Sequence, residues 1–274
     1  MKKLNLLAFV FTLLMGVSFT SCLGSDDSSS IDGICTVYVY QNIYAGTPYF
    51  MDAIGNTYVP SSASVSGIEQ NNSGFKFEDY EMMTIYYNFT VAEGEQKPTI
   101  NVDPSNPQTY NIDLVSVYPN ITVSEVVPAQ SVDDIETVAP GTAPVISLTQ
   151  STTGSAVLEM FDSKTLLLMT GFYCTYDTEK YKEHSIKMVY VLDEFTSGST
   201  SLTVYIQHNK GTDDGADVIG SYGIYGFNLQ QAIQAFTAKT GNVPTRIVVK
   251  AKETNTASTN LPDNYTEYSV EYEN

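Results

Sequence analysis

The sequence predicts an all-β protein, with a small closed barrel followed by a β-sandwich that contains one short helix. Short runs of β-branched and aromatic residues recur along the chain and are separated by turn residues, as strands are. Only one segment has apolar residues at helical spacing. The chain has 20 tyrosines, 12 phenylalanines and no tryptophan, and tyrosine pairs across neighbouring strands stabilise sheets. Its 274 residues are enough for two domains.

Residues 1–21 are organised like a lipoprotein signal peptide. Lys2 and Lys3 precede an apolar run over 4–17 that is short for a bilayer span. Small residues then lead to Cys22, where we expect cleavage before the cysteine and acylation of its thiol and new N-terminus. Two or three acyl chains give firm membrane anchoring. An ordinary secretory signal cut nearby is the alternative, but the Ser-Cys pair directly after the apolar core favours lipidation.

Residues 22–32 are predicted to form a flexible acidic tether, because they are small and polar and show no apolar period. Asp26 and Asp27 resemble the export signal that sends lipoproteins of the Bacteroidota to the outer face of the outer membrane. This resemblance implies a lipid-anchored, surface-exposed outer-membrane protein. In the alternative interpretation, the two acids only keep the tether soluble.

The charge of the chain limits its partners. There are 13 Lys and Arg residues against 31 Asp and Glu, a net charge of −18. Cleavage before Cys22 removes Lys2 and Lys3 and no acids, so the mature protein is two units more negative. Such a chain repels nucleic acid and anionic lipid headgroups. We therefore expect no nucleic-acid partner, and membrane contact only through the acyl chains on Cys22.

A barrel domain is predicted over 33–124, with no helix between its strands. The segment 110–118 has apolar residues at even positions up to Leu114 and at odd positions afterwards, which predicts a bulge. Three prolines predict a loop over 97–107. The expected strands cover 35–42, 48–52, 82–91, 110–118 and 121–123.

Residues 125–142 are predicted to be a linker, because Pro128 and Pro140 bracket a segment without a sustained apolar period. A β-sandwich is predicted over 143–274, in which the strands 185–192 and 201–208 pair and the last two strands form a hairpin. Leu229, Ile233 and Phe236 predict a helix over 228–239, with Asn228 as cap and Gly241 at its end. The expected strands are 145–148, 156–160, 165–176, 185–192, 201–208, 245–251 and 265–272.

Four segments carry a family resemblance across nearly the whole chain. They read FMD…GNTYVP over 50–60, LLLMTGFY over 166–173, HSIKMVY over 184–190 and YGFNL over 225–229. With the lipidation signal, they resemble the NigD-like lipoproteins of Bacteroides and relatives, whose biochemical role is not established. The resemblance implies an OB-like barrel and an immunoglobulin-like sandwich. Two departures are the Ala-Pro-Val start of the second domain at 143–145 and a longer helix after residue 229.

The cysteines and histidines do not form a recognisable reactive motif. Cys35 and Cys174 fall in different predicted domains, so we expect free thiols, although the compartment permits a disulfide. His184 and His208 are interpreted as structural or surface residues, because no nucleophile motif accompanies them. The acids of 213–217 lack the spacing of a calcium loop and are predicted to form a solvated loop. No metal, cofactor or catalytic residue is predicted.

These observations predict a non-enzymatic binding or envelope-assembly role. The partner is expected to be an envelope protein or a glycan, and the ligand-binding residues cannot be assigned from the sequence. A glycan-binding lipoprotein with a tyrosine-based face is one alternative. A fimbrial-type structural subunit is another, but Arg246 is the first arginine of the chain, which excludes arginine-directed removal of an N-terminal strand. An enzyme is the least favoured class.

Overall fold

The structure is a computed structural model that describes residues 31–42, 46–148, 158–215 and 218–273. The chain forms two compact units, residues 1–121 and 122–274. The predicted signal peptide and most of the tether, with Cys22, Asp26 and Asp27, lie outside the described residues. No helix in the described segments is long and apolar enough to cross a membrane.

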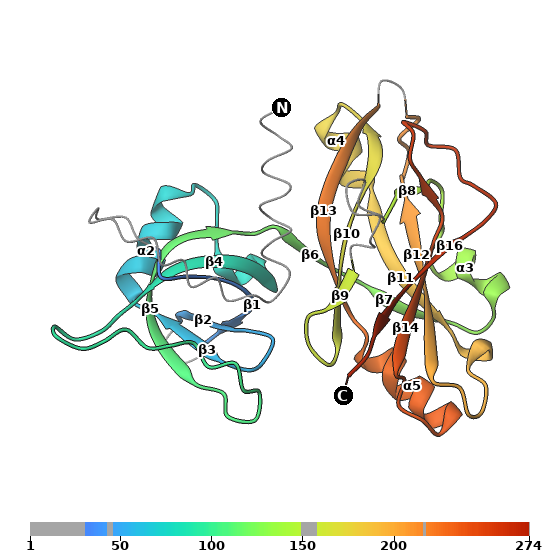
Figure 1. Ribbon diagram of the computed structural model, residues 1–274. Coiled ribbons are helices and arrows are strands. Elements are labelled where there is room, and N and C mark those ends of the chain that lie inside the picture. The colour runs from blue at the N-terminus through green and yellow to red at the C-terminus, as the bar shows by residue number, and fades with distance from the viewer. Residues whose placement is uncertain (1–30, 43–45, 149–157, 216–217, 274) are drawn as a thin grey trace. The chain divides into compact units, whose positions relative to one another are not determined.

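The first unit is a closed barrel of five strands (Figure 1) in the order β1-β2-β3-β5-β4. Neighbouring strands are antiparallel except β3 and β5, which run parallel. The predicted small barrel is therefore confirmed as a closed five-stranded sheet. Its strands are β1 (Gly33–Gln41), β2 (Pro48–Met51), β3 (Thr57–Pro60), β4 (Met82–Phe89) and β5 (Thr109–Tyr118).

The predicted bulge lies in β5. Tyr86 of β4 pairs with Ser116 and the next residue, Tyr87, pairs with Leu114, so Val115 is the extra residue. Leu114 is 7% exposed and Val115 is 45% exposed, as expected where an added residue reverses the inward and outward alternation. The change of apolar period in the sequence therefore predicts this bend correctly.

The prediction of a barrel without a helix is wrong. Helix α2 (Ser62–Asn71) follows β3, and the short 3-10 helix η1 (Phe77–Asp79) precedes β4. Parallel strands such as β3 and β5 need a crossover connection, and α2 lies in it. The helix is serine-rich and buries only Val65 and Ile68, so its apolar period is too weak to stand out in the sequence.

The turn between β2 and β3 explains the first segment of the family resemblance. The Asp52 carboxylate accepts hydrogen bonds from the backbone N–H and the side-chain amide of Asn56, both at 2.9 Å, and from the Tyr58 hydroxyl at 3.1 Å. Gly55 has a positive φ of 91°, which favours glycine. Asn56 also donates to the carbonyl of Asn101. These residues thus hold the turn against the loop before β5.

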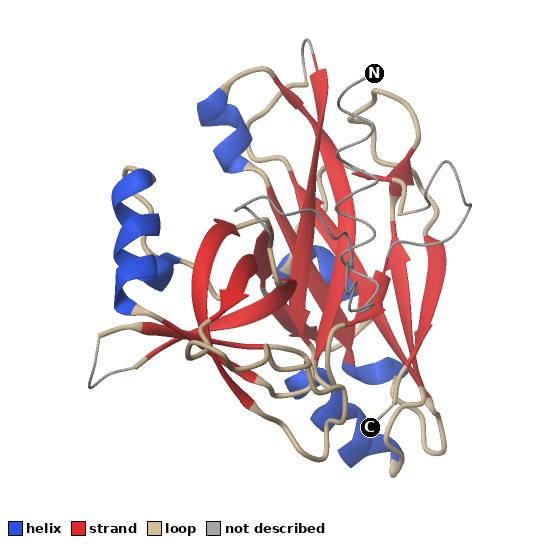
Figure 2. Cartoon of the chain, turned by 60° about the vertical axis from the view of Figure 1, so that its left-hand side comes forward, coloured by secondary structure: helices blue, strands red, loops and turns tan. Residues whose placement is uncertain are grey.

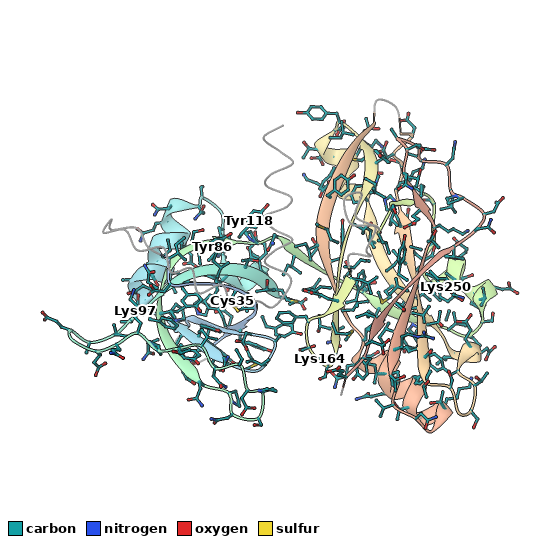
Figure 3. All side chains as sticks on the ribbon, in the orientation of Figure 1. Cys35, Tyr86, Lys97, Tyr118, Lys164 and Lys250 are labelled. Atoms are coloured by element: carbon teal, nitrogen blue, oxygen red, sulfur yellow. The ribbon has the colours of Figure 1, made fainter. Side chains whose placement is uncertain are left out.

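Tyrosines occupy both sides of the barrel wall. Tyr58 and Tyr110 are buried in the core, with ring centroids 5.6 Å apart. Tyr40 and Tyr49 form the kind of cross-strand pair that the sequence predicts, because they are opposite each other in β1 and β2 and stack at 5.2 Å. On the outside, Tyr118 of β5 is exposed (Figure 3). Most barrel tyrosines therefore have a packing role.

The second unit contains two large sheets that lie face to face (Figures 1 and 2). One has the order β6-β13-β10-β9, the other the order β16-β14-β12-β11-β7, and β8 pairs with β15 in a small third sheet. The first large sheet comprises β6 (Ile121–Ser124), β13 (Val218–Asn228), β10 (Thr165–Thr175) and β9 (Leu158–Met160). The other strands are β16 (Thr266–Glu271), β14 (Arg246–Ala251), β12 (Ser201–Asn209), β11 (Ser185–Val191), β7 (Val126–Ala129), β8 (Val145–Ile146) and β15 (Glu253–Thr254).

The main core of this unit lies between the two large sheets and is closed at one end by α5 (Gln230–Thr240), which contributes Ala232 and Phe236. The helix is confirmed where the sequence predicts it, and it ends at Gly241 with a φ of 81°. Asn228 accepts a hydrogen bond from the backbone of Gln230, at the start of α5. The predicted antiparallel pairs β11–β12 and β14–β16 are also present.

The prediction of a linker over 125–142 is wrong. Strand β7 pairs in parallel with β11, and it is followed by the 3-10 helix η2 (Val132–Asp134) and the helix α3 (Ile135–Val138). Ile135 and Ala139 pack with Val189 and Tyr205 in a second, smaller core. Each element is four residues or shorter, which is too short for a hydrophobic period to appear.

Three further elements differ from the prediction. Strand β6 pairs with β13 in the second unit and does not close the barrel. A further helix, α4 (Thr178–Glu183), lies at the opposite end of the sheets from α5 (Figure 1). Strand β13 was not expected at all, because its glycines interrupt the run of apolar residues. The parallel pairs β7–β11 and β12–β14 were not anticipated either.

Gly171 of β10 is paired with Tyr222 of β13 and has no room for a side chain. A Cβ atom at this position would lie 2.1 Å from the carbonyl oxygen of Ser221, which is backbone and cannot move aside easily. We expect Gly171→Ala to lower the free energy of unfolding by about 1–3 kcal/mol, as overpacking does. Gly223→Ala in β13 is the control, because its nearest neighbour would be a tyrosine ring atom at 3.5 Å. Urea unfolding of both variants checks this, and equal losses would contradict it.

Candidate functional site

Of the residues with a predicted role, Cys22, Asp26 and Asp27 lie outside the described residues, so lipidation and export remain predictions. Cys35 in β1 and Cys174 in β10 are both free thiols, as predicted. Burial and the nearby Asp52 carboxylate raise the pKa of Cys35 to about 12, and burial also raises the pKa of Cys174. Both thiols therefore stay protonated at neutral pH and are poor nucleophiles.

His184, His208 and Asp213 form a buried cluster at one end of the second unit. His184 follows α4, His208 is near the end of β12, and Asp213 lies in the loop after β12. The Nε2 atom of His184 is 3.0 Å from Oδ2 of Asp213, and its Nδ1 atom is 2.9 Å from Nε2 of His208. Both imidazoles stack on the ring of Phe172, with centroid distances of 4.4 and 4.8 Å.

This cluster decides one prediction and corrects another. The side chains of His184 and Asp213 are 0% and 1% exposed, and His208 is 2% exposed, so of the two predicted alternatives both histidines are structural residues and not surface residues. The predicted solvated loop over 213–217 is wrong at Asp213, although Asp214 is exposed. The sequence offered one usable signal. Antiparallel pairing of β11 with β12 places Ile186 opposite His208, which brings the only two histidines of the chain together.

Asp213 is held as a carboxylate by several donors. It accepts hydrogen bonds from the backbone N–H and hydroxyl of Thr175, from the N–H of Gly215 at 2.9 Å, and from His184. Burial by itself would raise the pKa of this carboxyl, but these hydrogen bonds hold the pKa well below its usual range. The cluster therefore contains a fixed negative charge.

The hydrogen bonds also determine where the protons lie. The Nδ1 atom of His208 is 3.0 Å from the carbonyl of Pro144, which can only accept, so Nδ1 carries a proton. Burial lowers the pKa of His208 to about 4, so its Nε2 is a bare acceptor at neutral pH. His184 must then donate from Nδ1 to His208 and from Nε2 to Asp213. It is the charged member of a buried ion pair.

This arrangement stabilises the fold but is poorly suited to catalysis. A histidine with protons on both nitrogens cannot act as a general base, and the side chains that bond or stack with His184 are Phe172, His208 and Asp213. None of the three is a nucleophile of the kind that a catalytic triad requires. The cluster is also closed to solvent. It connects α4, β10 and β12 through one charged, fully bonded network.

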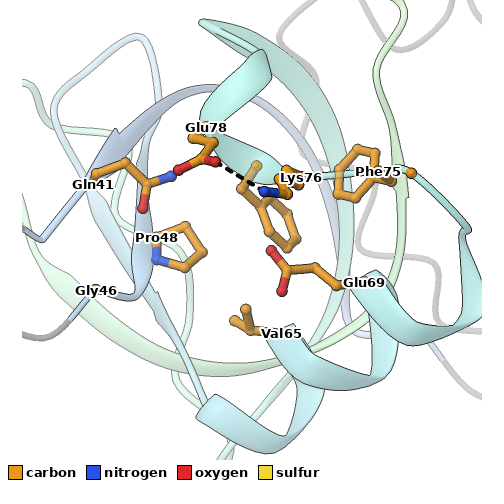
Figure 4. Close-up of a pocket in the computed structure, with 10 residues that line it drawn as sticks. Gln41, Gly46, Pro48, Val65, Glu69, Phe75, Lys76 and Glu78 are labelled. Atoms are coloured by element: carbon orange, nitrogen blue, oxygen red, sulfur yellow. Dashed lines mark hydrogen bonds and ion pairs between the residues drawn. The ribbon is translucent and has the colours of Figure 1, made fainter.

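A solvent-accessible cavity of about 440 Å³ lies in the barrel unit, between the β1–β2 hairpin and the segment from α2 to η1 (Figure 4). We call it the barrel pocket. Val65, Phe77 and Pro48 are buried residues that contribute apolar groups to its lining. Its exposed lining residues are the glycines Gly46 and Gly74 and four polar or charged residues, Gln41, Glu69, Lys76 and Glu78.

The ring of Phe75 forms one wall of the barrel pocket and is held by its neighbours. It stacks on Tyr80, with ring centroids 5.2 Å apart and planes at 19°, and it meets Phe77 edge-on at 4.9 Å. Lys76 and Glu78 form an ion pair at 3.5 Å (Figure 4), and both side chains are more than 60% exposed. The pocket thus combines a preformed aromatic wall with charged groups that can rearrange.

A second cavity of about 290 Å³ in the other unit is lined by Ser124, Glu125, Val126, Asn228, Gln230 and Gln231. In the described segments, no group of three or more His, Cys, Asp or Glu residues could hold a metal ion. The barrel pocket is larger than the second cavity and has an aromatic wall, so it is the better candidate for binding.

Comparison with known proteins gives structural matches only. No protein-family model and no curated protein sequence matches the chain. Among solved structures, a candidate lipoprotein from Bacteroides fragilis matches with a TM-score of 0.62 and 19% identity, over 88% of this chain and 97% of that one. A protein of unknown function from Bacteroides vulgatus matches with a TM-score of 0.51 and 13% identity, over 88% and 90% of the two chains.

A NigD-like immunity protein from Bacteroides caccae also matches, with a TM-score of 0.49 and 12% identity, over 88% of this chain and 94% of that chain. The Bacteroides fragilis match is a candidate lipoprotein from the genus whose lipoproteins the sequence resembles. At these identities, the first two matches establish the fold. The chain, which is mostly β and forms two units, therefore shares its fold with the Bacteroides fragilis protein.

Proposed function

We propose that this protein is a lipid-anchored, surface-exposed outer-membrane lipoprotein with a non-enzymatic binding role, and that the barrel pocket is its binding site. One observation carries the proposal. The barrel pocket has buried apolar residues, a fixed aromatic wall and exposed charged groups, which is how ligand sites are commonly built. The one histidine–carboxylate cluster described above is closed to solvent and already fully hydrogen-bonded.

The topology supports an OB-like barrel. Its strand order is β1-β2-β3-β5-β4, β3 and β5 are parallel, and α2 lies between β3 and β4. Small Greek-key barrels of this kind use strands and loops to bind ligands. The two facing sheets of the second unit support an immunoglobulin-like sandwich. Its parallel pairs β7–β11 and β12–β14 depart from the fully antiparallel form.

A blocking substitution tests whether the barrel pocket binds. Gln41 is an exposed residue of the pocket, and Gln41→Trp would fill the opening. Gln96→Trp, at an exposed position outside the lining, is the matched control. The full chain in detergent is labelled and applied to arrays of defined glycans and synthetic peptides. We expect hits that Gln41→Trp removes and Gln96→Trp retains. Equal binding by both variants would reject the pocket.

The anchor makes a separate prediction. Cys22→Ser leaves no thiol for the diacylglyceryl group, and cleavage before residue 22 should fail as well. We expect complete loss of labelling by a fatty-acid probe and accumulation of the longer precursor. Cys35→Ser is the control and should be labelled like the wild type. Undiminished labelling of Cys22→Ser would rule out the anchor.

The export signal can be tested without disturbing the anchor. Replacing Asp26 and Asp27 together with Ala should leave fatty-acid labelling intact, because Cys22 is unchanged. If these acids direct export, the protein on whole cells should change from protease-accessible to protected. Replacing Glu93 and Glu95 together with Ala, which removes the same charge from exposed positions of the barrel unit, serves as the control. Unchanged surface proteolysis of the double variant would reject the export signal and would leave the predicted anchor unaffected.

A further inference from the structure

We infer that the occupant of the barrel pocket is a lysine or arginine side chain from a basic segment of a partner protein. This inference rests on the proposed binding function and names the chemistry of its ligand. Lysine and arginine have a long apolar stem and a cationic head. The barrel pocket offers a matching arrangement, with apolar residues in its lining and carboxylates at exposed positions.

The apolar part of the pocket suits the stem. Val65 of α2 and Phe77 of η1 are buried members of the barrel core, and the Phe75 ring stands beside them as a wall. A cation above or beside an aromatic face gains a favourable electrostatic contact as well. Because Phe75 is stacked on Tyr80, this wall is in place before the ligand arrives.

The charged part of the pocket suits the head. Glu69 lies in the last turn of α2, where the carbonyl end of the helix carries partial negative charge. A carboxylate is unfavourable there, and this last turn contains no basic residue. A bound cation would relieve that repulsion. Glu78 provides a second carboxylate. Its ion pair with Lys76, at 3.5 Å, is exposed, and exposed ion pairs contribute little to stability, so Glu78 can exchange Lys76 for a bound cation.

The whole barrel unit favours a cation over an anion. Residues 31–121 contain ten acidic side chains and two basic ones, Lys76 and Lys97. Lys97 is bound to Asp32 at 2.6 Å, so it does not offset the carboxylates of the pocket. A field of this sign attracts basic segments and speeds their encounter with the protein. Phosphorylated or acidic ligands are disfavoured for the same reason.

A pair of peptides with the same number of amines tests both parts of the inference. The full chain in detergent is titrated with fluorescein-labelled hexalysine and with the hexamer of 2,4-diaminobutyric acid, whose stem is two methylenes shorter. Each buried methylene is worth about 0.8 kcal/mol, so the shorter peptide should bind about tenfold more weakly. Equal affinities would show that only net charge is sensed, which would overturn the inference.

Matched charge variants locate the site. Glu69→Gln and Glu78→Gln should each weaken hexalysine binding about threefold to tenfold, since each removes a charge-assisted contact. Glu95→Gln removes the same charge from an exposed position outside the lining and should change the affinity less than twofold. All variants should unfold like the wild type, because their side chains are exposed. Equal losses in the three variants would refute the site.

The remaining outcomes separate this inference from the proposed function. If Gln41→Trp abolishes binding of an arrayed glycan while hexalysine binds no better than its short-stem analogue, the pocket is a glycan site. The proposed function then stands and the inference falls. If Gln41→Trp leaves every bound probe unaffected, the pocket is not the binding site and both are rejected. If Gln41→Trp abolishes the binding of hexalysine alone, the proposed function and the inference are both supported.

Discussion

Asp213→Asn is expected to destabilise the second unit by about 3–5 kcal/mol, the usual loss when one partner of a buried ion pair is removed. The side chain of Asp213 is 1% exposed and bonds to His184 at 3.0 Å. Asparagine has nearly the same shape but no charge. It would leave a buried imidazolium without a counterion, and its amide would turn a donor toward Thr175 or toward His184, where the carboxylate now accepts hydrogen bonds from both.

The neighbouring Asp214→Asn is the control, because this residue is exposed and precedes the same glycine turn. We expect less than about 1 kcal/mol from it, as for most surface substitutions. Urea unfolding should be followed peptide by peptide with hydrogen-exchange mass spectrometry, so that β11 and β12 are read separately from the barrel. If both variants unfold at the same urea concentration, the buried ion pair contributes nothing measurable.

Much of the fold follows from local sequence patterns. The strands that were predicted well have dense β-branched and aromatic residues bounded by turns, as in β4 and β12. Helix α5 was predictable because it is eleven residues long and ends at a glycine. By contrast, α2 was hidden because only two of its ten residues are buried, and β13 because glycines interrupt its apolar residues. An apolar pattern predicts a helix or strand only where it persists over several residues.

The parallel pairs show a second limit. The partners of β7 and β14 are decided by packing between segments far apart in the chain, and a hydrophobic run does not encode its neighbour. For the same reason, Pro128 suggested a linker, although it lies in the edge strand β7, a position where proline is tolerated.

The histidine cluster was partly within reach of the sequence. The pairing of β11 with β12 was predicted, and its register implies that the two histidines are neighbours. Their burial was not predictable, because it depends on Phe172 from β10 and on the return of the loop that carries Asp213. The barrel pocket could not be foreseen, since α2 and η1, which line part of it, were themselves missed.

The stability of the second unit should decrease as the pH falls from about 6.5 to about 4, because of His208. Burial lowers the pKa of His208 from 6.5 to about 4 in the folded state. Above pH 6.5 neither state binds the extra proton, and between these pH values only the unfolded chain does. The expected loss is about 1.4 kcal/mol per pH unit and about 3 kcal/mol in total. The groups that act on His208 are His184, Lys210 and the carbonyls of Pro144 and Ala143.

Glu159 in β9 acts in the same range with the opposite sign. Burial raises the pKa of Glu159 from 4.5 to about 7, so the folded state takes up its proton first and gains stability as the pH falls. The measurement is therefore best made in a Glu159→Gln background, with urea unfolding of β11 and β12 at half-unit steps from pH 6.5 to pH 4. Adding His208→Gln should remove most of the slope, whatever its effect on stability at pH 7. A slope that is the same with histidine or glutamine at position 208 would show that protonation of the cluster does not control the acid stability of this unit.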